Sequence, residues 1–394
     1  MDRPLLNRRL AEFGTTIFAE MSALAVRTGA INLGQGFPDT DGPEEVREAA
    51  VRALRDGRGN QYPPGPGIPE LRTAVAAHQE RFYGHLGVSC DPDTEVLVTA
   101  GATEAIAASL LALLEPGDEV IALEPYYDSY AACIAMAGGT RVPVTLRPDP
   151  ESGSYALDLD ELRDAVTDRT RLILLNTPHN PTGTVLTRDA LAEVARLACE
   201  RELLVITDEV YEHLVFEGEH LPLASFPGMR ERTVTIGSAG KTFSFTGWKV
   251  GWVTATPELV GAVRSAKQFL TYVSAGPFQY AVAEALALPD SYYTGLRDDL
   301  RAKRDILATG LTDAGFQVFR PSGTYFITTD IRPLGFDDGF AFCRTLPERA
   351  GVVAIPNAVF YDHQDQGAPF VRFAFCKRTD VLNEAVTRLK QLAP

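Results

Sequence analysis

Short continuous runs of Val, Ile and Leu alternate with amphipathic helical patterns between about residues 95 and 255. An apolar run without alternation is typical of a strand buried on both faces, and helices between such strands connect a parallel sheet. The pattern therefore predicts an α/β fold with a mostly parallel sheet between two helical layers. The expected strands lie at residues 95–99, 119–123, 171–176, 203–207, 233–237 and 248–255, and the expected helices at 102–114, 127–137 and 189–200.

The pattern changes after about residue 290. A long charged helical segment at 291–314 precedes several short apolar runs, a helix near 338–347 and a last helix at 379–391. Short strands mixed with helices indicate a smaller α+β domain. A chain of 394 residues is long enough for two domains. We expect an N-terminal arm that packs with the small domain at 1–40, a large domain at 41–288 and the small domain at 289–394.

The charge balance limits the partners of the chain. The 37 basic and 52 acidic residues give a net charge of −15. Such an acidic surface repels the phosphates of nucleic acids and of anionic membranes, so we expect neither as a partner. The sequence has no apolar signal segment at its start and no run of about 18 apolar residues, which favours a cytoplasmic protein.

Neither the cysteines nor the histidines have the spacing of a known metal motif. The five cysteines are far apart and include no C-x-x-C pair, which is typical of free thiols in a reducing compartment. Among the six histidines, the separation of His213 and His220 does not fit the H-E-x-x-H motif of a zinc-binding helix. We therefore expect no bound metal.

Polar residues stand at the ends of several predicted strands. Gly101, Asn176 and Asp208 each lie at or just after such an end. Ligands bind at the carboxyl ends of strands in open α/β sheets, and the free N–H groups at the start of a helix can hold a phosphate. These positions predict one ligand site at this edge of the sheet.

The segment that starts at Ser238, SAGKTFSFTGWKVGW, contains two of the six lysines in the chain, Lys241 and Lys249. The first 240 residues contain no lysine. A lysine amine in a mostly apolar, glycine-lined site is set up for a lowered pKa and for Schiff-base chemistry. The segment thus supplies the candidates for amine chemistry.

The order of GATEAI, EPYYDSY, NTPHNPTG, ITDEVY, SAGKTFSFTGWKVGW, GTYF and VRFAF resembles the pyridoxal-phosphate (PLP) aminotransferases of fold type I, class I/II. With INLGQGFPD and NQYPPGPG, the resemblance covers nearly the whole chain. The resemblance is strongest to a subgroup that contains the kynurenine, glutamine and methionine aminotransferases and the actinobacterial N-succinyldiaminopimelate aminotransferases. It implies a large domain with a mostly parallel seven-stranded sheet, a smaller α+β domain, the cofactor pyridoxal 5'-phosphate and a ping-pong transamination.

The resemblance also assigns roles around the cofactor ring. Lys241 matches the lysine that forms the Schiff base with the cofactor and later moves the substrate proton. Asp208 matches the carboxylate paired with the ring nitrogen. Asn180 and Tyr211 match the pair that hydrogen-bonds the 3-hydroxyl group, and Tyr127 matches the aromatic side chain stacked on the ring. His179 stands where relatives often carry asparagine, and we assign it no catalytic role.

The family's phosphate site maps onto residues from three segments. Here Ala102 and Thr103 stand at a position that varies within the subgroup, which leaves the roles of their side chains open. Their backbone N–H groups are still expected to bind the phosphate. A tyrosine that reaches the phosphate of the neighbouring subunit corresponds to Tyr62, which implies a homodimer. The phosphate-binding residues implied by the resemblance are Gly101, Ala102, Thr103, Ser238, Lys249 and Tyr62 of the other subunit.

The substrate site follows from the same resemblance. Arg372 matches the arginine that binds the α-carboxylate, helped by Asn180 and the backbone of Gly36, and Phe18 matches an aromatic position at the side-chain pocket. The aromatic residues, without a second placed arginine, favour an amino donor with a neutral, aromatic or sulfur-containing side chain. Two alternatives remain open: N-succinyl-LL-diaminopimelate as donor in lysine biosynthesis, and a cysteine-conjugate β-lyase.

Overall fold

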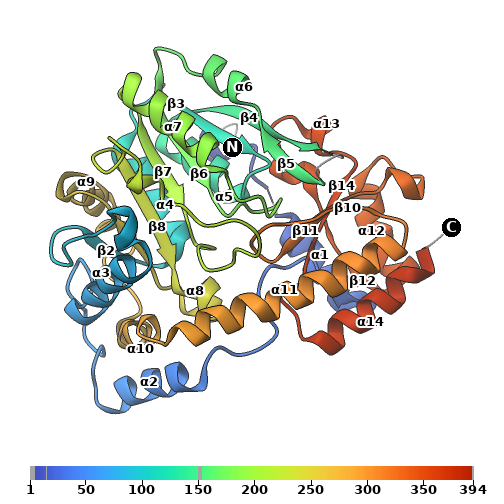
Figure 1. Ribbon diagram of the computed structural model, residues 1–394, viewed down its shortest axis with the longest axis horizontal. Coiled ribbons are helices and arrows are strands. Elements are labelled where there is room, and N and C mark those ends of the chain that lie inside the picture. Colours follow the sequence, from blue (N-terminus) through green and yellow to red (C-terminus); the bar gives the residue numbers. More distant parts are fainter. Residues whose placement is uncertain (1–4, 15, 150–152, 393–394) are drawn as a thin grey trace.

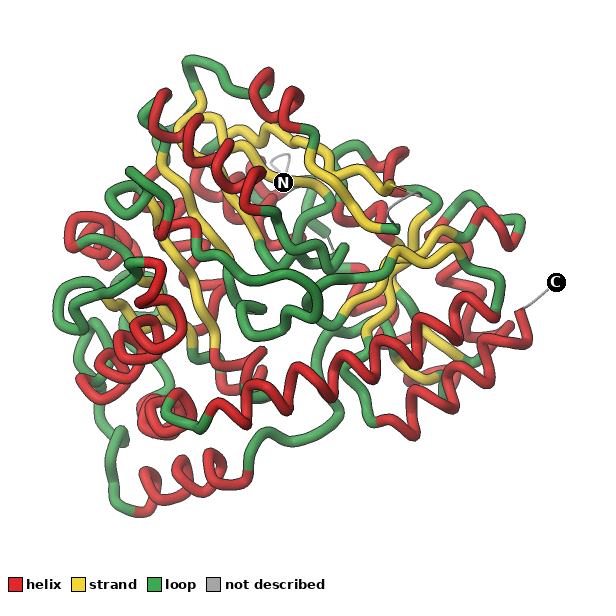
Figure 2. The backbone as a smooth tube through the Cα atoms, in the orientation of Figure 1, coloured by secondary structure: helices red, strands yellow, loops and turns green. Residues whose placement is uncertain are grey.

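The computed structural model describes residues 5–14, 16–149 and 153–392. Its largest element is an eight-stranded, mostly parallel sheet with helices on both faces (Figures 1 and 2). Only β9 and β5 run antiparallel to their neighbours. Along the sheet, the strands are β2 (Val96–Thr99), β9 (Gly251–Thr254), β8 (Thr233–Ser238), β7 (Leu204–Asp208), β6 (Thr170–Asn176), β3 (Glu119–Glu124), β4 (Thr140–Asp149) and β5 (Ser154–Leu157).

Alternate residues of each central strand face opposite helical layers. In β3, Val120 and Ala122 pack with one core and Ile121 and Leu123 pack with another, and all four are buried. Burial on both faces explains why the strands are continuous apolar runs. The helices of the first core are α4 (Gly101–Leu113), α5 (Asp128–Ala137) and α9 (Pro257–Lys267), and those of the second are α6 (Leu159–Asp164) and α7 (Arg188–Glu200).

A further apolar core covers the β2 and β9 edge of the sheet. Val98 and Trp252 of these strands pack there with residues of several helices. The contributing helices are α2 (Glu44–Arg55), α3 (Pro69–Tyr83) and α10 (Gly276–Leu286), and the short helix α8 (Ala239–Thr242) joins the same core.

The smaller domain is built on a four-stranded antiparallel sheet, β10-β11-β14-β13. The N-terminal segment joins this region, because β1 (Ile31–Asn32) pairs in parallel with β12 (Val352–Val353). The domain bounds given above stay a prediction. The remaining elements are α1 (Ile17–Thr28), α11 (Asp290–Asp313), β10 (Gln317–Phe319), β11 (Phe326–Asp330), α12 (Gly339–Ala350), β13 (Ile355–Pro356), α13 (Gln364–Gly367), β14 (Phe370–Ala374) and α14 (Thr379–Leu389).

The structure confirms the predicted fold class and changes two details. The sheet has eight strands in the described part of the chain and not seven. Both β4 and β5 lie outside the six strand ranges expected above, and β5 adds to the edge as an antiparallel partner of β4. The strand expected at 248–255 begins only at Gly251. Lys249, with φ of 53°, is in the left-handed conformation, which interrupts an extended strand.

None of the helices in the described segments is both long enough and apolar enough to cross a lipid bilayer.

Candidate active site

A pocket of about 460 Å³ opens at the carboxyl ends of the parallel strands, where the large and small domains meet. It lies at the edge where β6 ends at Asn176, β7 at Asp208 and β8 at Ser238. The structure therefore brings the predicted segments to one place. Every site residue predicted from the sequence lines this pocket except Tyr62: Phe18, Gly36, Gly101, Ala102, Thr103, Tyr127, Asn180, Asp208, Tyr211, Ser238, Lys241, Lys249 and Arg372.

One end of the pocket is a cradle for an anion at the start of α4. The cap residue Ala100 has no side-chain hydrogen bond to the helix, so the first N–H groups, including those of Ala102 and Thr103, have no cap partner. Gly101 has φ of 75°, and a Cβ at this position would lie 3.3 Å from Nζ of Lys249. The Lys249 amine also lies 3.5 Å from the Thr103 hydroxyl. Free N–H groups and an ammonium group at a helix N-terminus bind phosphate well.

Ser238 links this cradle to the lysine segment. It caps the short helix α8, and its hydroxyl oxygen accepts a hydrogen bond from the N–H of Gly240 at 3.2 Å. The hydroxyl hydrogen is left for a ligand in the pocket.

Lys241 lies on the wall of the pocket with its amine near aromatic rings. Its Nζ is 5.7 Å from the ring centre of Tyr211 and 5.8 Å from that of Tyr325. Among the described residues, none forms a hydrogen bond or ion pair with this amine. Burial lowers the pKa of Lys241, against the opposing effects of the Cys376 thiol and the Asp208 carboxylate. A larger neutral fraction makes the amine a better nucleophile and proton acceptor.

Asp208 is a buried carboxylate at the end of β7. Burial raises its pKa to about 6, and the hydroxyl of Tyr130, which donates to Oδ2 at 2.6 Å, opposes this rise. Asn176 holds the strand end in place, because its amide donates to the carbonyl of Asp208 at 2.8 Å and accepts from the N–H of Asn180 at 2.7 Å. A carboxylate held at this depth can pair with a cationic ring nitrogen.

Arg372 of β14 lies inside the pocket with 1% of its surface exposed. Its guanidinium donates to Oδ1 of Asn180 and to the carbonyl of Gly34, each at 2.9 Å. Its Nε has no partner among the described residues, none of which forms an ion pair with it. Burial lowers the pKa of Arg372 to about 10. A buried guanidinium without an acidic partner is a ready site for a substrate carboxylate.

Aromatic side chains complete the substrate end of the pocket. The Arg372 guanidinium lies 4.1 Å from the ring centre of Phe326 and 5.4 Å from that of Phe18. The carbonyl of Gly36 accepts from the Tyr325 hydroxyl at 2.7 Å, and a Cβ on Gly36 would lie 2.3 Å from Phe326. Glycine is therefore required here for the close approach of the backbone.

The remaining predicted residues take different positions. Tyr127 precedes α5 and lines the pocket, and Tyr211, which is buried, lines it from the turn after β7. Tyr62 does not line the pocket of its own chain. It is 81% exposed, and its ring packs edge-on against Tyr272 with the ring centres 5.5 Å apart.

The pocket also contains residues to which the sequence-based prediction gave no role in the site, among them the polar residues Gln35, Asp128 and Tyr130. Tyr130 was included in the expected helix at 127–137 without a separate role, and its bond to Asp208 spans 78 positions. Gln35 belongs to the INLGQGFPD motif, whose polar residues could have identified it.

The chain is similar to known aminotransferases along nearly its whole length. N-succinyldiaminopimelate aminotransferase from Mycobacterium tuberculosis has a solved structure with a TM-score of 0.95 and 56% identity, covering 98% of this chain and 100% of that chain. Methionine aminotransferase of Escherichia coli K12 is 40% identical over 99% of this chain and 100% of its own. Human kynurenine–oxoglutarate transaminase 3 is 36% identical over 97% of this chain and 89% of its own.

A family model for the aminotransferases of class I and II matches residues 28–389. The match extends through both domains and includes every predicted pocket residue except Phe18. The chain therefore belongs to the class I and II aminotransferases, PLP-dependent enzymes that exchange an amino group between an amino acid and a 2-oxo acid.

Proposed function

We propose that N-succinyl-LL-diaminopimelate is the amino donor of this aminotransferase and that a 2-oxo acid is the acceptor. The observation that carries the proposal is the 56% identity to N-succinyldiaminopimelate aminotransferase of Mycobacterium tuberculosis over 98% of this chain. Identity to the methionine aminotransferase is lower, at 40%. The first of the two alternatives left open by the sequence thus becomes the proposed reaction.

The residues of the pocket fit PLP. The cradle at Gly101, Ala102 and Thr103, with Lys249, suits the phosphate. Asp208 lies deep enough to pair with the ring nitrogen, and Lys241 offers an amine without a partner among the described side chains. We assign Tyr127 to the ring face, and Tyr211 with Asn180 to the 3-hydroxyl group.

The protein groups divide the chemistry between them. When bound, the cofactor supplies an electron sink for the charge left at the substrate Cα after loss of its proton. Asp208 stabilises a protonated ring nitrogen through its negative charge. Lys241 takes up and returns the Cα proton at Nζ, for which its lowered pKa suits it. Arg372 holds the α-carboxylate, which orients the Cα–H bond toward that amine.

Tyr130→Phe is expected to weaken PLP binding at acidic pH, with the midpoint of this acidic loss of affinity raised by about one to two pH units. A hydrogen bond to a charged group contributes about 1.5–3 kcal/mol, and one pH unit corresponds to about 1.4 kcal/mol. The lost bond stabilises the ionised form of Asp208, whose pKa is about 6 with the bond present. Without it, Asp208 stays protonated to a higher pH and pairs less well with a cationic ring.

The affinity is measured by titrating the apoenzyme with PLP across the range from pH 5 to pH 8. Tyr127→Phe is the matched control, because Tyr127 lines the same pocket and makes no hydrogen bond to Asp208. The control is expected to keep the midpoint in place. An unchanged midpoint in Tyr130→Phe would contradict the role given to this bond.

A second candidate donor class is the neutral, aromatic and sulfur-containing amino acids. The specific observation in its favour is the aromatic lining of the pocket, to which Phe18, Phe37, Tyr127 and Phe326 contribute. The 40% identity to a methionine aminotransferase also supports this class.

The absorbance spectrum of the holoenzyme distinguishes the two candidates. Each amino acid of a panel is added without an oxo acid, and conversion of the cofactor to its amino form is followed by loss of the visible band. The panel contains N-succinyl-LL-diaminopimelate, glutamate, methionine, glutamine, kynurenine and phenylalanine. We expect the succinylated diamine and glutamate to react fastest. Faster reaction with methionine, glutamine or the aromatic donors would replace the proposal by the second candidate.

We also propose a homodimer in the cytoplasm, with Tyr62 reaching the cofactor phosphate of the neighbouring subunit. An exposed apolar surface on the same side as Tyr62 supports this assembly, since Tyr62, Phe269 and Tyr272 are 81%, 84% and 51% exposed. Sedimentation should give twice the chain mass of 42.8 kDa. A monomer that retains full activity would refute the proposed role of Tyr62.

A further inference from the structure

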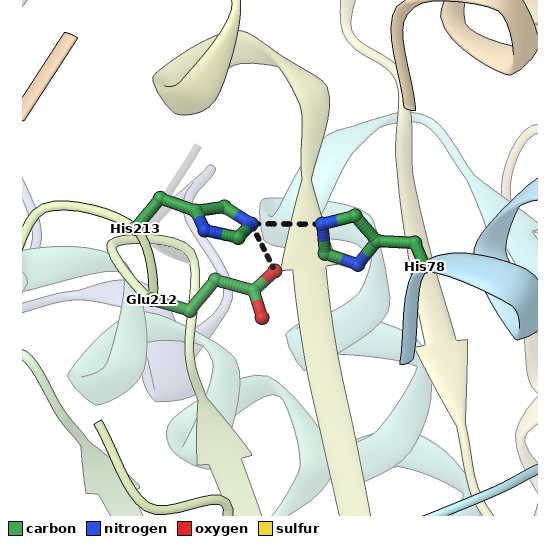
Figure 3. Close-up of side chains that lie close together, drawn as sticks. All are labelled: His78, Glu212 and His213. Carbon is green, nitrogen blue, oxygen red and sulfur yellow. Dashed lines mark hydrogen bonds and ion pairs between the residues drawn. The ribbon is translucent and has the colours of Figure 1, made fainter. Parts of the chain in front are cut away.

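Three side chains that could bind a metal ion converge outside the active-site pocket (Figure 3). His78 projects from α3, while Glu212 and His213 lie in the turn that follows β7. Nε2 of His78 lies 2.8 Å from Nε2 of His213, and Nε2 of His213 lies 3.9 Å from Oε1 of Glu212. One nitrogen or oxygen atom from each residue lies within 4.8 Å of those of the other two.

The cluster is enclosed by protein. His78 is 3% exposed, and the side chains of His213 and Glu212 are each 7% exposed. Phe82 and Tyr293 form an aromatic wall, with ring centres 4.6 Å and 4.4 Å from that of His213.

The neighbouring charges are already paired. Arg81, which lies over the ring of Phe82, forms an ion pair with Asp290. His220 is paired with Glu209 at 2.9 Å. The phenol of Tyr83 is close enough to interact with the Glu212 carboxylate. The Glu212 charge therefore has no cation of its own in the ligand cluster.

Two polar atoms of the cluster are not satisfied by the side chains around them. Oε2 of Glu212 and Nδ1 of His78 are buried and have no hydrogen-bond partner in the described part of the chain. The Nε2 atoms of the two rings lie at hydrogen-bond distance from each other, so one proton lies between them. A metal ion would use both Nε2 lone pairs and the carboxylate at once.

We propose that His78, His213 and Glu212 form a binding site for a divalent transition metal ion such as Zn²⁺, with the fourth position open to water. Zinc binds imidazole nitrogen and carboxylate oxygen at about 2.0–2.2 Å, so tetrahedral ligand atoms lie about 3.3 Å apart. The separations of 2.8 Å and 3.9 Å lie on either side of that value. The third pair of ligand atoms, from His78 and Glu212, lies within 4.8 Å, so side-chain shifts of about 1–1.5 Å would complete the site.

The position of the site gives the ion a structural role. It would tie α3 to the turn that begins two residues after Asp208 and carries Tyr211. The metal-free expectation from the sequence arose because His78 and His213 are 135 positions apart. The sequence motifs of zinc sites rest on short spacings and cannot detect such a pair.

The test uses the holoenzyme after removal of free PLP and dialysis against EDTA, followed by CoCl₂ or ZnCl₂. Cobalt in a four-coordinate site with nitrogen and oxygen ligands gives d–d bands at longer wavelength than the cofactor band. We expect these bands to saturate at one ion per chain, and we expect ZnCl₂ to abolish them and to raise the melting temperature. Absence of cobalt bands together with an unchanged melting temperature would overturn the proposal.

His78→Gln and Glu212→Gln are the variants, and His85→Gln, which alters an exposed histidine just beyond α3, is the matched control. The cobalt bands and the thermal shift should both be lost in His78→Gln. In Glu212→Gln, the affinity for the metal ion should fall at least tenfold. Both signals should be retained in His85→Gln. If Glu212→Gln alone folds, its lower affinity suffices as the test. Cobalt bands of equal intensity in the wild type and in both variants would show that the ion binds elsewhere, and they would refute the proposed site.

Discussion

Replacing Lys241 with alanine is expected to abolish transamination while the fold persists. Proton transfer by a positioned group contributes about 10²–10⁴-fold to a rate, and the covalent attachment of the cofactor is lost as well, so we expect a fall of at least about 10⁴-fold in kcat. The Lys241 amine has no hydrogen-bond partner among the described side chains, and burial lowers its pKa. Its removal therefore leaves no buried group unpaired, and stability should be retained.

The half-reaction of the Lys241→Ala variant is followed in a single turnover, and its melting temperature is compared with that of the wild type. Lys390→Ala is the matched control, because that side chain is half exposed and pairs with Asp313 at the surface. The control should keep full activity. Turnover of Lys241→Ala within tenfold of the wild-type rate would refute the role given to Lys241.

The sheet could be predicted from the sequence because its central strands are buried on both faces. Continuous apolar runs such as Leu172–Leu175 leave no alternative to an interior strand. The edge strand β5 carries no such signal. In it only Tyr155 is buried, so four residues of mixed polarity do not stand out from a loop. Its pairing depends on the neighbouring strand β4.

The start of β9 was predicted too early for a local reason. Lys249 is left-handed, and the turn before it is held by Trp248, which stacks between Phe245 and Phe278. Phe278 comes from α10, far along the chain. Tertiary stacking of this kind overrides the apolar run that predicts a strand.

The positions of the site residues could be predicted because they follow strands whose ends share one edge of the sheet. The contacts between the site residues could not be predicted from the sequence. The bond from Tyr130 to Asp208 depends on the packing of α5 against the sheet, and the contact of Arg372 with Asn180 joins the two domains across 192 positions. Spacing along the chain contains no information about either contact.

Arg372→Lys is expected to lower kcat/KM for amino acids by about 10- to 150-fold, which corresponds to about 1.5–3 kcal/mol for a charged hydrogen bond. Lysine keeps the positive charge but loses the planar fork that binds a carboxylate through two N–H groups. It would also leave Oδ1 of Asn180 or the carbonyl of Gly34 without its present donor. Most of the loss should appear in KM, because the carboxylate is held both before and during proton transfer.

A comparison of substrates separates carboxylate binding from a general loss of structure. Amino acids and 2-oxo acids both carry the carboxylate, so Arg372→Lys should lower kcat/KM for both by a similar factor. For an amine without a carboxylate, the ratio of variant to wild-type activity should stay near one. Arg332→Lys is the matched control, since Arg332 follows the same small-domain sheet but is exposed and paired with Asp330. An equal loss with the simple amine would mean that Arg372 stabilises the pocket without binding the carboxylate.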